Sequence, residues 1–181
     1  MRYAKINSLD ITNGEDIGVS VFVQGCRFHC RGCFNKETWD FNGGKEWNEE
    51  VENKLIDLLY RKYIKRLSIL GGEPLADENL PLTHRLLQIV TDINLRDNRE
   101  IKIWIYTGYK IEEIIQHDSN DYSVLRAKAV ILSDYIVDGR FDIDKLDLTY
   151  SKVKFAGSTN QRIIDVQQSI CEEKIILWES K

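Results

Sequence analysis

The sequence predicts an α/β fold, a partial (incomplete) β/α barrel with a mainly parallel sheet, formed by a single domain over residues 1–181. Two observations support this prediction. Short apolar runs alternate with amphipathic helical patterns, and the runs are followed by turns that contain glycine. This βαβα order implies parallel strands joined by right-handed crossovers, in an open doubly wound sheet or in a barrel. A complete barrel takes about 250 residues, so this chain can form only part of one.

The expected strands are short runs of Ile, Leu, Val and aromatic residues. We place them at residues 19–23, 66–70, 101–106 and 135–137, with weaker closing or edge strands at 162–166 and 174–178.

Helical patterns lie between these runs. One spans residues 51–59 after a capping Asn48, and a second continues to Ile93 from a first turn that contains Pro81. A third covers residues 111–115. Residues 122–132 fit either a helix or a strand, and we interpret them as a helix that leads into the strand at 135–137.

The composition is that of a globular protein without a membrane segment. Of the 181 residues, 43% are hydrophobic and 30% are charged, which allows a real core. No apolar run approaches the roughly 20 residues of a membrane helix, and the N-terminus lacks the apolar stretch of a signal peptide. A net charge of −4 does not favour a nucleic-acid surface. We therefore expect a cytoplasmic protein that binds neither membranes nor nucleic acid directly.

Three of the four cysteines lie within eight positions, at Cys26, Cys30 and Cys33. With Cys171 far away, this is a poor layout for a disulfide framework, and reduced thiols that hold a metal fit better. Three thiolates on one loop can bind three corners of a cubane iron–sulfur cluster and leave the fourth iron without a protein ligand. That open iron would be a place for a substrate to bind.

A structural zinc site is the main alternative for these cysteines. It would need His29 or Cys171 as a fourth ligand, and only Cys30 and Cys33 have the usual CxxC spacing. The chain would then be a zinc-stabilised interaction module and not an enzyme. A redox dithiol formed by the same pair would leave Cys26 unexplained. We therefore favour a 4Fe-4S cluster.

The second expected strand is followed by the turn Gly71-Gly72-Glu73-Pro74. Its glycines let the backbone approach a ligand closely, and Glu73 can accept a charge-assisted hydrogen bond from an ammonium group. We expect a side chain at Gly72 to fill the space of such a ligand without disturbing the metal site.

The next two strands also end in polar turns, which contain Thr107, Asp138 and Arg140. Because the strands are expected to be parallel, these turns and the cysteine loop would share one face. Arg140 can pair with a ligand carboxylate, while Asp138 or Thr107 can bind ribose hydroxyls. One elongated ligand could contact all of them.

The CxxxCxxC spacing of the cysteines, together with the GGEP turn, resembles the radical S-adenosylmethionine superfamily. This resemblance implies that S-adenosylmethionine binds the open iron, and that Gly32 and Phe34 beside the cysteines join the turn residues in cofactor binding. It also implies that the reduced cluster donates an electron that cleaves this cofactor. No acid–base side chain is required, so none is assigned as catalytic.

Finer features resemble the anaerobic ribonucleotide reductase activating proteins. They lie at residues 32–39, 104–109, 137–141 and 157–162. This resemblance implies that the partner is a large glycyl-radical enzyme, the anaerobic reductase, and that the electron comes from a flavodoxin- or ferredoxin-type donor. An activase of another glycyl-radical enzyme, such as pyruvate formate-lyase, stays open. One departure is that Gly18 stands where related activases usually have an arginine.

Overall fold

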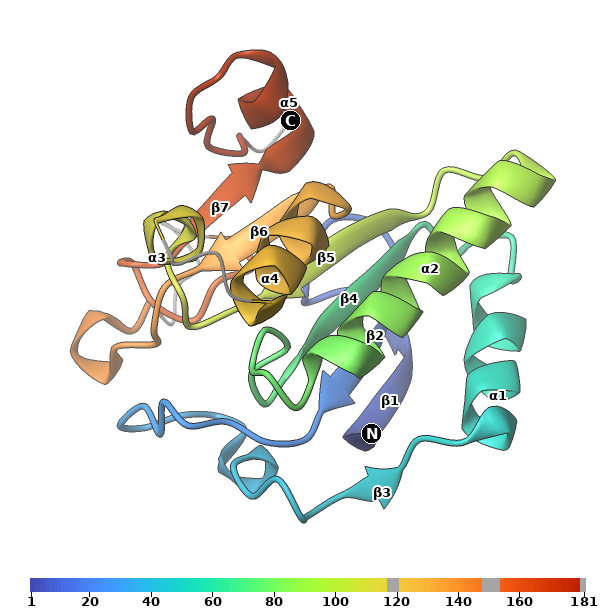
Figure 1. The fold of residues 1–181 in the computed structure, drawn as a ribbon, viewed down its shortest axis with the longest axis horizontal. Helices are drawn as coiled ribbons and strands as arrows, with labels where there is room; N and C mark the ends of the chain where they lie inside the picture. The colour runs from blue at the N-terminus through green and yellow to red at the C-terminus, as the bar shows by residue number, and fades with distance from the viewer. Residues whose placement is uncertain (117–120, 148–153, 180–181) are drawn as a thin grey trace.

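The computed structural model describes residues 1–116, 121–147 and 154–179. Its centre is one seven-stranded sheet in the order β3-β1-β2-β4-β5-β6-β7 (Figure 1). The strands are β1 (Arg2–Asp10), β2 (Gly18–Val23), β3 (Lys45–Glu46), β4 (Arg66–Gly71), β5 (Lys102–Tyr106), β6 (Tyr135–Asp138) and β7 (Arg162–Asp165). The helices are α1 (Glu49–Leu59), α2 (Leu80–Asp97), α3 (Ile111–Ile115), α4 (Asp121–Ile131) and α5 (Val166–Cys171), with 3-10 turns at Lys36–Thr38 and Ile143–Lys145.

The four central strands, β2, β4, β5 and β6, are parallel to one another. Antiparallel strands extend the sheet on both sides, with β1 and β3 beyond β2 and β7 beyond β6. The α/β class and the parallel centre of the sheet are therefore confirmed. The row is open, because β3 and β7 lie at opposite ends of it. The curvature of a partial barrel stays a prediction.

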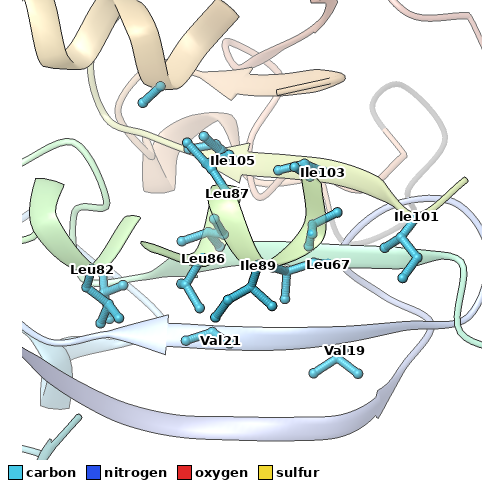
Figure 2. Packing of buried hydrophobic residues seen from close by; sticks show 14 of the residues in the cluster. Val19, Val21, Leu67, Leu82, Leu86, Leu87, Ile89, Ile101, Ile103 and Ile105 are labelled. Atoms are coloured by element: carbon cyan, nitrogen blue, oxygen red, sulfur yellow. The ribbon is translucent and has the colours of Figure 1, made fainter. Parts of the chain in front are cut away.

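The two faces of the sheet bury different side chains. Alternate residues of the central strands, such as Val21, Leu67 and Ile105, belong to the large core beneath the helices. Figure 2 shows Leu86 and Ile89 of α2 packed over Val21 and Leu67. Burying each such side chain contributes about 1.5–3 kcal/mol. The opposite face carries a smaller cluster around Trp104, which includes Val137, Ala156 and Ile163.

The expected helices form where the sequence places their starts. The Asn48 side chain accepts a hydrogen bond from the backbone N–H of Val51 at 3.0 Å, which confirms it as the cap of α1. Pro81 lies in the first turn of α2, and the ambiguous segment at 122–132 forms α4. None of the described helices is both long and apolar enough to span a membrane.

Sequence patterns fail at the two ends of the chain. β1 was not expected, because only Tyr3 and Asp10 of its residues are buried and no alternating pattern marks it. The segment expected as a strand at 174–178 does not form a regular strand; it lies along β7 through an isolated antiparallel bridge between Leu177 and Ile164, and the Trp178 N–H donates to the Ile163 carbonyl at 2.8 Å. Its side chains are mostly exposed, so burial does not hold it in the sheet. The short helix α5 was also not expected.

Candidate functional site

The carboxyl ends of the central parallel strands surround a cavity of about 300 Å³. The cysteine loop that follows β2, the turn after β4 and the turn after β5 all contribute to its lining. The predicted residues that line it are Cys26, Cys30, Cys33, Phe34, Gly71, Gly72, Glu73 and Thr107. The parallel strands thus bring together, at one cavity, turns that are far apart in the sequence.

The root of the cysteine loop is held by backbone hydrogen bonds. The N–H of Gly25 donates to the carbonyl of Thr38 at 2.7 Å, and the carbonyl of Gly25 accepts from the N–H of Glu73 at 2.8 Å. The buried Asn79 side chain donates to the carbonyls of Gly25 and Glu73, at 3.1 and 2.9 Å. Gly25 has φ +107°, and a Cβ there would lie 2.0 Å from the Phe41 ring. The cysteine loop and the Gly-Gly-Glu turn therefore form one unit.

The three cysteine thiols are free and partly buried. Burial raises the pKa of the Cys26 thiol to about 11, with further increases from the charges of Glu73 and Cys30, although backbone N–H groups of Phe28 and His29 oppose them. The pKa of Cys30 is also raised, by burial and then by its neighbour Cys33. Without a cation these two thiols stay protonated at neutral pH. A metal centre would supply the positive charge that releases their protons.

The donor set at this loop suits a cluster with one open iron. The backbone N–H of Asn35 lies 3.4 Å from the Cys33 sulfur, in the manner of a donor to a cluster ligand. Of the two possible fourth ligands, Cys171 is exposed at the end of α5 and His29 stacks on Trp39 with ring centroids 4.5 Å apart. Neither lines the cavity. In the described part of the chain, no three His, Cys, Asp or Glu side chains are grouped around a single-ion site.

Glu73 connects the turn after β4 to the turn after β5. Its Oε1 accepts from the N–H of Leu75 at 2.9 Å and from the hydroxyl of Thr107 at 2.7 Å, and its Oε2 accepts from the N–H of Gly108 at 2.7 Å. Burial raises the pKa of this carboxyl to about 7, although these three hydrogen bonds lower it in part. Oε2 can accept one more bond. The ammonium contact of Glu73 stays a prediction.

A pH dependence of stability follows from this raised pKa. The folded protein keeps the Glu73 proton up to about pH 7, whereas an unfolded chain loses it near 4.5. The free energy of unfolding of the cluster-free protein is therefore expected to fall as pH rises through this window. Glu73→Gln should remove that slope, and Glu78→Gln, at an exposed ion pair, should keep it. Denaturant titrations at several pH values measure it, and identical slopes in all three proteins would contradict the assignment.

Three predicted residues lie outside the cavity lining. Asp138 is buried, and its carboxylate accepts from Arg162 Nε and from the N–H of Ile111, each at 2.9 Å. Arg140 lies over the Phe28 ring, and Gly32, with φ +78°, lies against Ile143. Sequence reasoning could not see these partners because they come from distant elements. The ligand contacts of Asp138, Arg140 and Gly32 stay predictions, without support from this placement.

Thirteen further residues line the cavity and were not assigned individually from the sequence, although Gly108 and Gly139 belong to turns that were expected at this face. They are Thr12, Asn13, Phe28, Asn35, Leu70, Tyr106, Gly108, Gly139, Phe141, Phe155, Ala156, Gly157 and Gln161. The two-residue period of β5 could have indicated Tyr106, since Ile103 and Ile105 face the helices and alternate with it. No comparable signal marks Thr12 or Asn13, which lie in the loop between β1 and β2.

Comparison with known proteins decides between the cluster and the alternatives. A family model described as a 4Fe-4S single cluster domain matches residues 12–164. The chain is 35% identical to the anaerobic ribonucleoside-triphosphate reductase-activating protein of Salmonella typhimurium, over 89% of this chain and 96% of that protein. The chain belongs to the family of these activating proteins. Identity to the proteins of Escherichia coli K12 and Enterobacteria phage T4 is 34% and 31%, over 96% and 93% of their lengths.

Membership in the activating-protein family confirms the resemblance found in the sequence. The protein is a radical S-adenosylmethionine enzyme, and its cofactors are a 4Fe-4S cluster and S-adenosylmethionine. The zinc-stabilised module is therefore excluded as its function.

Proposed function

We propose that this protein activates an anaerobic ribonucleoside-triphosphate reductase by generating a glycyl radical on it. The observation that carries the proposal is the joint lining of one cavity by Cys26, Cys30, Cys33 and the Gly-Gly-Glu turn, in a chain of the activating-protein family. When bound, the cluster and S-adenosylmethionine would supply the one-electron chemistry that removes a hydrogen atom from a glycine of the partner.

The residues of this chain bind the cofactors, orient them and exclude water. Cys26, Cys30 and Cys33 would hold three irons, while the turn at Gly71 and Gly72, which lines the same cavity, would lie along S-adenosylmethionine at the strand ends. Glu73 keeps the Thr107 turn in place and has a free acceptor position for an ammonium group. We propose all of these as cofactor-binding residues.

Aromatic side chains form much of the remaining wall. Phe34 and Phe141, with ring centroids 5.0 Å apart, line the cavity together with Phe28 and Phe155. Phe34 is 64% exposed, so part of this wall lies at the surface, where a protein substrate can cover it. An apolar wall closed by the partner would shield the radical from water and from side reactions.

The proposal also includes the electron donor, the cellular compartment and the domain organisation of the protein. A flavodoxin- or ferredoxin-type carrier would deliver single electrons to the cluster in the cytoplasm, where thiols stay reduced. All 181 residues would form one domain, because one sheet contains strands from β1 near the N-terminus to β7 at Arg162–Asp165. A partial barrel would wrap that sheet around the cavity.

The test is anaerobic electron paramagnetic resonance on the reconstituted protein with S-adenosylmethionine, a one-electron reductant and the reductase from the same cell. The expected result is a glycyl-radical doublet and the onset of deoxyribonucleotide synthesis. Cys30→Ala should give no doublet, and Cys171→Ala should give the wild-type signal. A doublet on pyruvate formate-lyase and none on the reductase would replace the proposed partner.

A further inference from the structure

Arg66 is fully buried at the start of β4, and its guanidinium is enclosed by the loop between β1 and β2. Nε donates to the carbonyl of Glu15 and Nη2 to that of Asp10, each at 2.8 Å. Nη1 donates to the carbonyl of Asn13 and to the hydroxyl of Ser68. The Asp10 carboxylate, 3.6 Å from Nη2, balances the charge. A single guanidinium thus holds residues 10–15 of this loop.

This loop forms part of the cavity wall. Leu67 and Ile69 of β4 belong to the core beneath the helices, so Arg66 and Ser68 project from the opposite face of the sheet. The loop lies against that face, because the Ser68 hydroxyl also donates to the carbonyl of Asn13 at 2.6 Å. Thr12 and Asn13 themselves line the cavity. Arg66 contacts Asn13 directly, and the Asp10 carboxylate beside its guanidinium accepts from the N–H groups of Thr12 and Asn13 at 2.7 and 3.0 Å. The position of both residues therefore depends on the buried pair of Arg66 and Asp10.

The guanidinium of Arg66 fits beside β2 because Gly18 has no side chain. In the parallel pair of β2 and β4, Gly18 is the direct partner of Arg66. A Cβ on Gly18 would lie 2.8 Å from Cζ of Arg66, closer than two carbons can approach. Paired residues of neighbouring strands project from the same face. An arginine at either position would therefore enter the same space from adjacent strands.

We infer that Arg66 is a positioning residue for the cofactor cavity, which fixes Thr12 and Asn13 as a wall of the space where S-adenosylmethionine binds, and that Gly18 is required to admit it. The inference rests on the proposed function only in taking this cavity as the cofactor site.

The first test compares Arg66→Lys with wild type as cluster-loaded protein. Lysine keeps the charge beside Asp10, but its single nitrogen cannot replace the planar fork that reaches three carbonyls. We expect unchanged iron content and a loss of roughly 10- to 100-fold in affinity for S-adenosylmethionine, because the wall shifts by a fraction of an ångström or more. The readout is the change in the electron paramagnetic resonance spectrum of the reduced cluster as S-adenosylmethionine is titrated. Arg85→Lys, at a partly exposed ion pair with Glu52 on the helical side, is the matched control and should bind normally.

The second test changes the other side of the same contact, at Gly18 of β2. Gly18→Ala adds one methyl group that would lie 2.8 Å from Cζ and 2.9 Å from the backbone carbonyl oxygen of Arg66, and it leaves every charge in place. It should weaken binding as Arg66→Lys does, and the double variant should be no weaker than the stronger single variant, because both act on one contact. If the Arg66→Lys protein does not hold its cluster, the affinity of the Gly18→Ala protein for S-adenosylmethionine tests the inference by itself.

Wild-type affinity in a Gly18→Ala protein with a full cluster would overturn the inference, even if its melting temperature fell, since Arg66 would then only stabilise the fold. The affinity is measured without any partner protein. Failure to generate a radical on the reductase would therefore contradict the proposed function and leave this measurement unaffected.

Discussion

Replacing any one of Cys26, Cys30 and Cys33 by Ala is expected to abolish the visible absorbance and most of the bound iron of anaerobically reconstituted protein. Each thiol lines the same cavity, and no other cysteine among the described residues does. Two thiolates would leave two irons of the cubane without protein ligands. The raised pKa values of Cys26 and Cys30 add to this loss, because each remaining thiol must still be deprotonated at a cost.

Cys171→Ala is the matched control for these variants. Cys171 is exposed at the end of α5, so its replacement should leave iron content, absorbance and cleavage of S-adenosylmethionine at wild-type levels. Equal loss of iron from Cys171→Ala would make Cys171 a ligand and would contradict the model of a cluster with an open iron.

Gly72→Ala is expected to remove the cluster as well as cofactor binding. From the sequence, a side chain at Gly72 was expected to fill only the space of the ligand. In the structure, a Cβ there would lie 2.4 Å from the carbonyl oxygen and 2.9 Å from the nitrogen of Gly25, the residue before Cys26. Backbone atoms cannot rotate away as a side chain can, so the root of the cysteine loop must move. Overpacking of this kind costs about 1–3 kcal/mol, up to about a hundredfold in cluster retention.

Iron analysis and visible absorbance after anaerobic gel filtration measure this loss. The matched control is Gly157→Ala, in the same cavity, where the added Cβ would lie 3.0 Å from an atom of the Phe141 ring. That ring can turn, so the cluster should be retained. A Gly72→Ala protein that keeps its iron and fails only to bind S-adenosylmethionine would restore the interpretation made from the sequence.

Much of the site was predictable because its chemistry lies in short segments. The spacing of Cys26, Cys30 and Cys33 indicates three ligands of one centre wherever the loop lies, and Gly71 to Glu73 mark a turn that a ligand can approach. The alternation of strands and helices then places both at the carboxyl end of a parallel sheet. The structure agrees with the α/β fold class, and the comparisons agree with the 4Fe-4S cluster.

Asp138 and Arg66 show where this reasoning stops. Asp138 ends a strand beside a glycine, as a ligand-binding residue does, yet its carboxylate is paired with Arg162 of the antiparallel strand β7. Arg66 looks like the polar start of an ordinary strand, yet it is buried and holds the cavity wall at Asn13. The partners of both charges lie more than twenty residues away in the chain.

The sequence by itself determined the order of the central strands and helices along the chain, the spacing of the three clustered cysteines and the Gly-Gly-Glu turn. Each of these depends on periodicity or spacing within one short segment. Such a local pattern does not depend on how the rest of the chain folds. Only the tertiary structure decided which polar residues face the cavity and which pair with one another behind it. A buried charge takes the partner that the sheet brings beside it, and that partner is set by strand order and register.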